Sequence, residues 1–320
     1  MRIHNVTIPA MLVLAAMSMV ACIQDYVMDI PDGKAITFDD AFIEKATRTA
    51  QDPSMSNGEL TAFDVWGFVK EYDGTVFVDQ DVILEDGVWT YDGTQYWVPE
   101  QPYYFAALAP MNSDNISHVL ATGEAAKLGL GIVTFSNVDG TEDLLYAHDN
   151  VISKKLTEIE DAIQFQFQHL LSKVKFTFRS GFITDNAYVK VRNITMTTPA
   201  KASINVAQLD YSNSWSLEDE KVTLEFGDVA KLGHGENSES AYERLAIPAS
   251  SSYVYNISFD VDLFMGQQLV YTTGLTSVVT GFELEMGKSY NFMAEITPES
   301  LDLDKVTFDV IKVNVWNPAQ

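Results

Sequence analysis

Strict alternation of apolar and polar residues is the feature that most narrowly limits the fold of this chain. Between Tyr255 and Leu263 every second residue is apolar, and the same two-residue period recurs over residues 289–296 and 306–310. Successive side chains of a strand point to opposite faces of a sheet, so this period is typical of strands that bury one face. The sequence therefore predicts an all-β protein.

Turn signals divide the chain into many short segments. Asp-Gly, a dipeptide that favours tight hairpins, occurs five times, and residues 89–97 predict a hairpin centred on Asp92-Gly93. The parity of the alternation changes near His169, which predicts either a β-bulge or a break between two strands. Helical signal is limited to short stretches at 41–46, 115–123 and 153–161. Short strands with frequent turns favour β-sandwiches, with a domain boundary in the charged stretch 154–161.

The first 22 residues have the layout of a bacterial lipoprotein signal. Residues 8–19 are almost wholly apolar, and Met19-Val20-Ala21 leads into Cys22, the single cysteine of the chain. The stretch is shorter than the ~20 apolar residues that a spanning helix needs. We predict that residues 1–21 are removed as a signal peptide and that Cys22 is acylated, which anchors the exported chain to a membrane. An ordinary secretory peptide with a chance cysteine is the alternative.

The charge of the chain excludes one class of partner. It carries 45 acidic and 20 basic residues, a net charge of −25, and shows no basic patch. Nucleic acids are bound through Lys and Arg side chains, so we exclude nucleic acid as a partner. Hydrophobic residues make up 47% of the chain, which indicates a globular body and not a disordered one.

No pattern in the sequence indicates catalysis or a metal site. The five histidines form no metal-binding pair, and neither a Gly-x-Ser-x-Gly elbow nor a phosphate-binding loop occurs. We interpret His169, beside two leucines, as a hydrogen-bonded structural residue. Asp302, Asp304 and Asp309 match no calcium-binding loop and are interpreted as solvated surface. The sequence thus predicts neither an enzyme nor a cofactor.

The aromatic residues of the first half allow two interpretations. Trp66, Trp89 and Trp97 cluster there with several tyrosines. An exposed aromatic platform would bind sugars, whereas core packing and hairpin pairing explain the same residues without a ligand. We favour the core.

The order of these features resembles the fimbrillin (Mfa-like) lipoproteins of Bacteroidales, the subunits of type V pili. Besides Cys22, the matching pieces are the following segments: Thr47-Arg48-Thr49; the aromatic run from Trp89 through Tyr96-Trp97 to Tyr104-Phe105-Ala106-Ala107-Leu108-Ala109-Pro110; His169-Leu170-Leu171-Ser172-Lys173-Val174; and Val313-Asn314-Val315-Trp316. The resemblance covers nearly the whole chain after Cys22. It implies two tandem transthyretin-like β-sandwich domains with few short helices, over residues 22–157 and 158–320.

The resemblance also implies a mode of assembly. An arginine-specific protease would cut between Arg48 and Thr49 and remove residues 22–48, including a strand near Ala35–Phe38. A strand of the next subunit, expected from Val306–Trp316, would fill the opened groove, and head-to-tail repetition would give a surface fimbria. The implied partners are other pilin subunits, the outer membrane through the lipid anchor, and a host or bacterial surface receptor in adhesion.

Two other functions stay open at this point. A monomeric or anchor lipoprotein that binds a glycan or a host protein would retain the residues before Arg48 and expose Trp89 and Trp97. A secreted enzyme would need a cleft with converging His, Glu or Asp groups, which no feature of the sequence leads us to expect.

Overall fold

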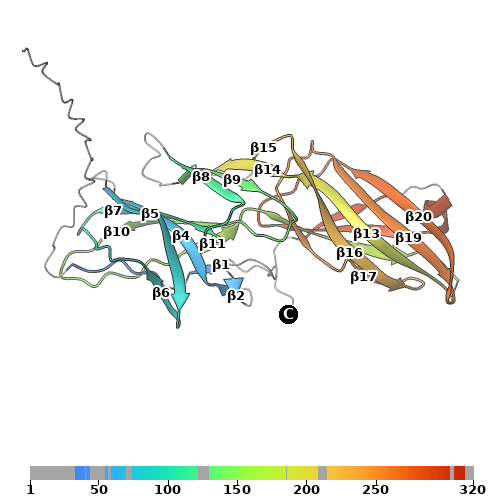
Figure 1. Ribbon diagram of the computed structural model, residues 1–320, viewed down its shortest axis with the longest axis horizontal. Coiled ribbons are helices and arrows are strands. Elements are labelled where there is room, and N and C mark those ends of the chain that lie inside the picture. Colours follow the sequence, from blue (N-terminus) through green and yellow to red (C-terminus); the bar gives the residue numbers. More distant parts are fainter. Residues whose placement is uncertain are drawn as a thin grey trace, which may run out of the picture.

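The structure, a computed structural model, is built almost entirely of strands. It describes residues 33–39, 41–43, 55–56, 59–69, 74–121, 130–184, 186–207, 215–302 and 306–313. Within these residues the one helix is α1 (Pro298–Asp302). The predicted all-β class is confirmed. Figure 1 shows an elongated molecule, with β4, β5, β7 and β10 towards one end and β13, β16, β19 and β20 at the other.

A seven-stranded sheet forms the first end. Its order is β1 (Phe42–Ile43), β11 (Gln166–His169), β10 (Leu145–Ile152), β7 (Pro102–Ala109), β4 (Ala62–Val69), β5 (Gly74–Glu85), β6 (Val88–Tyr91). The pairings are antiparallel except that between β1 and β11. Alternate residues of β4 enter two different cores, Phe63 and Val65 on one face and Trp66 on the other. The central strands are therefore buried on both faces, which explains their nearly continuous apolar sequence.

A four-stranded sheet joins the two halves of the sequence. Its order is β15 (Ser216–Leu217), β14 (Lys201–Asn205), β9 (Leu130–Ser136), β8 (Ile116–Leu120). β14 pairs with β9 from Lys201 opposite Ser136 to Asn205 opposite Ile132. Beneath this sheet one apolar cluster combines residues of both halves, including Trp66, Phe135 and Ile204. The domain boundary at 157/158 stays a prediction.

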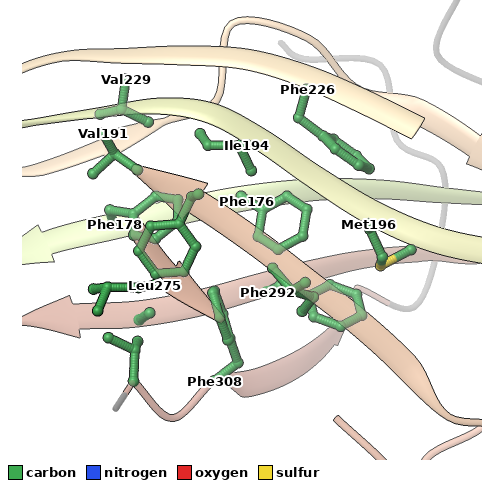
Figure 2. Packing of buried hydrophobic residues seen from close by; sticks show 14 of the residues in the cluster. Phe176, Phe178, Val191, Ile194, Met196, Phe226, Val229, Leu275, Phe292 and Phe308 are labelled. Carbon is green, nitrogen blue, oxygen red and sulfur yellow. The ribbon is translucent and has the colours of Figure 1, made fainter. Parts of the chain in front are cut away.

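Two further sheets form the second end. The first has the order β17 (Asn237–Glu239), β12 (Ser172–Ser180), β21 (Ser289–Ile296), β22 (Asp309–Val313), and β18 (Arg244–Ala246) also pairs with β12. The second has the order β16 (Lys221–Leu232), β13 (Ala187–Pro199), β19 (Tyr255–Met265), β20 (Gln268–Val279). Inward side chains of both sheets form one core, seen in Figure 2. A small separate hairpin pairs β2 (Met55–Ser56) with β3 (Glu59–Leu60).

Most predicted strands are confirmed. β19 and β21 coincide with the two longest alternating segments, and β11 and β12 are separated at Leu170-Leu171, where the parity changes.

The predicted helices are wrong wherever the structure describes them. Phe42–Ile43 is a strand, Ile116–Leu120 is strand β8, and residues 153–161 contain turns and no helix. Helices this short are marginal by themselves, and sheet pairing with β9 and β11 prevails.

The predicted hairpin at residues 89–97 is also wrong. The turn lies at Asp86-Gly87, and Trp89 pairs with Leu84 of β5. Asp86 and Gly87 have φ values of 50° and 81°, the positive values that a tight two-residue hairpin turn requires. Tyr96 pairs instead with Ala35, near the start of the described chain.

Candidate functional site

The candidate site is an apolar groove in the first sheet system, filled by residues 33–39, here called the N-terminal segment. Its backbone is hydrogen-bonded on two sides. On one side Ile36 N donates to Gln95 O at 2.8 Å and Trp97 N donates to Lys34 O at 2.9 Å. On the other side Asp39 N donates to Ile163 O at 3.0 Å and Ile163 N donates to Thr37 O at 2.8 Å. The segment is thus inserted as an added strand between residues 95–97 and Ile163.

The side chains of the N-terminal segment alternate between groove and solvent. Ile36 and Phe38 are buried, with Phe38 only 5% exposed, whereas Ala35, Thr37 and Asp39 are exposed. The Phe38 ring lies among four other rings, at centroid distances of 5.7–5.9 Å: Phe63, Phe77, Tyr91 and Phe165. Without the segment, these rings would line an open apolar groove.

Tyr91 fixes the segment to β6. Its hydroxyl donates to Ile36 O at 2.8 Å and accepts from Gln95 N at 3.0 Å. Burial raises the pKa of Tyr91 above the usual phenol value, so the hydroxyl keeps its proton and remains a donor to the segment.

The N-terminal segment can be separated from the sheet because of its position in the chain, before every other strand that borders the groove. Phe38 pairs with Ile163 in parallel, and β1 continues the parallel pairing with Phe42 opposite Gln166. The inserted residues of these pairs, Phe38, Phe42 and Ile43, all precede Arg48 in the chain. A single cut after Arg48 would therefore free the inserted strand without interrupting any later element.

The C-terminal segment, residues 306–313, packs on the core of the second sheet system in a similar way. β22 is an edge strand that pairs only with β21 among the described strands. Val306 and Phe308 are buried, while Thr307 and Asp309 are exposed. Figure 2 shows the Phe308 ring beside Phe176 and Phe178, at centroid distances of 5.6 and 5.8 Å.

The two segments share a sequence pattern and a burial pattern. Ile36-Thr37-Phe38-Asp39 corresponds to Val306-Thr307-Phe308-Asp309, and in both the first and third residues are buried and the second and fourth exposed. Each phenylalanine enters a core of other aromatic rings. The C-terminal segment therefore carries the side chains that the groove accepts.

The sequence-predicted site residues fall into two groups. Cys22, Arg48 and Thr49 lie outside the described residues, as does Trp316. The strand expected near Ala35–Phe38 lies in the groove, as described above.

The aromatic platform of the sugar-binding alternative is absent from the described part of the chain, and the favoured core packing is confirmed. Trp97 is only 2% exposed and packs on Tyr103, with ring centroids 4.7 Å apart. Trp89 is half-buried and packs on Phe63 at 5.0 Å. The exposed Trp89 and Trp97 required by the sugar-binding alternative are contradicted, and these residues belong to the core.

The polar residues singled out in the sequence have structural positions. His169 is buried, and its Nδ1 lies 2.5 Å from Oδ2 of the equally buried Asp143, which confirms a hydrogen-bonded structural histidine. Asp302 and Asp309 are exposed, as expected of solvated surface, and Asp304 lies outside the described residues. Among the residues with described positions, no group of three or more His, Cys, Asp or Glu side chains is placed to hold a metal ion. No helix in the described ranges has the length and apolar character to cross a membrane.

Comparison with known proteins places the chain in a family. The model of a family described as fimbrillin-like matches residues 47–316. A fimbrial protein from Bacteroides vulgatus is 13% identical, with 88% of this chain and 99% of that chain covered and a TM-score of 0.57. A candidate cell adhesion protein from Bacteroides ovatus is 14% identical over 88% and 96% of the two chains, with a TM-score of 0.49.

The fimbrial anchor protein Mfa2 from Porphyromonas gingivalis is 10% identical over 87% and 97%, with a TM-score of 0.36. No protein with a curated description matches the chain. At such identities the Bacteroides vulgatus structure shows a shared fold alone. The family model, in contrast, spans most of the sequence, and the chain therefore belongs to the fimbrillin-like family.

Proposed function

We propose that this chain is a structural subunit of a cell-surface fimbria that assembles by donor-strand exchange and supports adhesion. The observation that carries the proposal is the pair of matching segments. The N-terminal segment, which precedes Arg48, fills an apolar groove, and the C-terminal segment repeats its sequence and burial pattern. Membership of the fimbrillin-like family favours a structural and adhesive role over an enzymatic one.

The first step of the proposed assembly is removal of the N-terminal segment. Cleavage between Arg48 and Thr49 would release Ile36 and Phe38 from the groove. The rings around Phe38 would then face water, and the backbone groups of Gln95, Trp97 and Ile163 that bind the segment would lose their partners. Unpaired strand edges and exposed apolar surface are what a donor strand binds.

The second step is insertion of the C-terminal segment of a neighbouring subunit. Val306 and Phe308 would take the positions of Ile36 and Phe38, and the Phe308 ring would exchange its contacts with Phe176 and Phe178 for contacts with groove rings. Aromatic burial lost in the donor is thereby regained in the acceptor. A head-to-tail contact between two different surfaces of the molecule gives a filament when its rotation does not close into a ring.

The proposal includes export and anchoring. Acylation of Cys22 would hold the precursor at the outer membrane until the cut at Arg48 separates the lipid from the mature subunit. A copy that escapes the cut would keep both its lipid and its filled groove. Such a copy would serve as an anchor at the membrane.

The deciding experiment is mass spectrometry of the N-terminus of the chain recovered from the cell surface. We expect the wild type to begin at Thr49 and to form filaments visible by electron microscopy. Arg48→Ala should begin at acylated Cys22 and form none, whereas Lys45→Ala, a matched change upstream of the cut, should behave as wild type. If the wild type begins at acylated Cys22, strand removal is wrong and a monomeric or anchor lipoprotein that binds a glycan or a host protein becomes the better interpretation.

A further inference from the structure

A cavity of about 230 Å³ lies beside the outer strand of the four-stranded sheet, away from the groove. It is formed by β4, β5, the loop after β7, and β8. Residues lining it include Asp64, Trp66, Asp79, Pro110, Asn112 and His118. Its walls combine two carboxylates with aromatic and apolar side chains, and no Lys or Arg is among the residues that line it.

Asp64 has a buried carboxyl group, and its Oδ1 accepts no hydrogen bond from the described residues. The residue is 8% exposed, and Asn112 N donates to its Oδ2 at 3.1 Å. No donor in the described part of the chain reaches Oδ1. Burial, the negative charges of Asp79 and Asp81, and a hydrogen bond with the Asp81 side chain together raise the pKa of Asp64 to about 7. Ionisation of Asp64 would leave Oδ1 a buried acceptor without a donor, which is costly in folded proteins, so a cationic donor in the cavity would stabilise the carboxylate.

The walls of the cavity are held in place by other contacts. Asn112 Nδ2 donates to Asp81 Oδ2 at 3.2 Å, and Glu142 accepts hydrogen bonds from Ser113 Oγ and from Asn115 Nδ2. The Trp66 and His118 rings meet edge to face at 4.8 Å. The site therefore has a fixed shape before any ligand binds.

The chemistry of these walls selects the ligand. An acceptor oxygen beside other acidic groups favours a cation that carries N–H donors. The aromatic side chains of the wall can contact the methylene groups of a Lys or Arg side chain, or its cationic end. A calcium ion would need six to eight oxygen ligands, and only four side chains of the lining carry oxygen: two carboxylates, the Asn112 amide and the Ser113 hydroxyl. The net charge of −25 makes the chain attractive to basic proteins.

We propose that this cavity binds the ammonium or guanidinium end of a basic side chain presented by a partner protein, with Asp64 as the principal acceptor. The site does not depend on strand exchange, because its residues lie outside the groove and outside both terminal segments. The cation would displace the proton of Asp64 and bind a carboxylate.

The test is an NMR titration of the ¹⁵N-labelled chain with short peptides. The probes are acetyl-Gly-Lys-Gly-amide, its Arg counterpart, and the norleucine counterpart, which lacks the charged group. We expect saturable shifts of the Trp66 indole N–H and the Asn112 amide with the Lys or Arg peptide and none with norleucine. Because the carboxylate must ionise, affinity should rise roughly tenfold or more between pH 5.5 and pH 8.

Two variants separate binding at this site from general charge attraction. Asp64→Asn should weaken binding about tenfold or more, the scale of one charge-assisted hydrogen bond. Asp86→Asn removes the same charge at the exposed β5–β6 turn and should leave affinity within about twofold of wild type.

Four results would overturn all or part of the proposal. The first is equal binding of the norleucine peptide, and the second is unchanged affinity in Asp64→Asn. The third is a response of these resonances to calcium chloride but not to the peptides, which would assign the cavity to a metal ion. Free n-butylamine that binds as tightly as the peptides would refute the partner protein and assign the site to small amines.

Discussion

Asp64 should make the stability of this protein depend on pH in a way that one substitution removes. In the folded chain burial and neighbouring acids raise its pKa to about 7, whereas the ordinary value for aspartate is 3.8. Asparagine has nearly the same shape, can still accept from Asn112 N and does not titrate. The difference in unfolding free energy between Asp64→Asn and wild type therefore isolates this carboxyl.

The sign follows from proton binding. Between about pH 4 and pH 7 the folded chain holds a proton on Asp64 that the unfolded chain has lost. Stability from the neutral carboxyl is therefore lost as the pH rises through this window. One pKa unit corresponds to about 1.36 kcal/mol, so the interval from 3.8 to about 7 corresponds to roughly 4 kcal/mol. Relative to wild type, the variant should gain about this amount between pH 4 and pH 8.

Urea unfolding at pH 4.5, 6, 7 and 8, followed by tryptophan fluorescence, measures this difference. Asp86→Asn serves as the control, because its exposed side chain at the hairpin turn should give a difference that does not change with pH. If the free-energy difference between Asp64→Asn and wild type changes by less than about 1 kcal/mol across the range, Asp64 is ionised in the folded protein. The proposal that the cavity binds a cationic side chain through Asp64 would then fail.

Three other substitutions test the groove, the anchor and the core. Phe38→Ala should destabilise the uncut chain by about 3 kcal/mol in urea unfolding, through loss of its ring contacts, yet leave filaments unchanged because the residue is discarded; altered filaments would mean that the segment is retained. Cys22→Ser should release the precursor from membranes in cell fractionation, and continued membrane retention would contradict acylation at this residue. Gly67→Ala should cost about 1–3 kcal/mol in the same unfolding assay, because the new Cβ would lie 2.8 Å from the Phe105 ring; Gly274→Ala, which meets only the Asp260 side chain, is the control, and equal effects would refute the packing argument.

Local patterns predicted the strands whose burial is one-sided. β19 and β21 alternate cleanly because each packs one face on the core, so the sequence period equals the burial period. β8 was misjudged because residues 116–120 are half-exposed, and only pairing with β9 makes them a strand. The pairing of β14 with β9 joins residues about 70 positions apart, and no local signal specifies it.

The two candidate sites differ in how far the sequence revealed them. The strand in the groove was expected at Ala35–Phe38 from the family resemblance, and its apolar alternation is visible in the sequence. The cavity was missed because Asp64, Asn112 and His118 meet only in the folded chain. One signal was available: Asp64 interrupts the apolar run of β4, a strand buried on both faces, and an acid in such a run requires a partner.

The sheet shared by the two halves has a mechanical consequence for a filament under tension. In the proposed head-to-tail fibre, a pull would enter at the groove in the first half of the chain and leave through β22 in the second half, so it would pass through this sheet. β9 and β14 run roughly along the long axis in Figure 1, so the load shears their paired backbone bonds together instead of peeling them apart singly. Each subunit would then act as a stiff link, and the fibre would bend mainly at the joints between subunits.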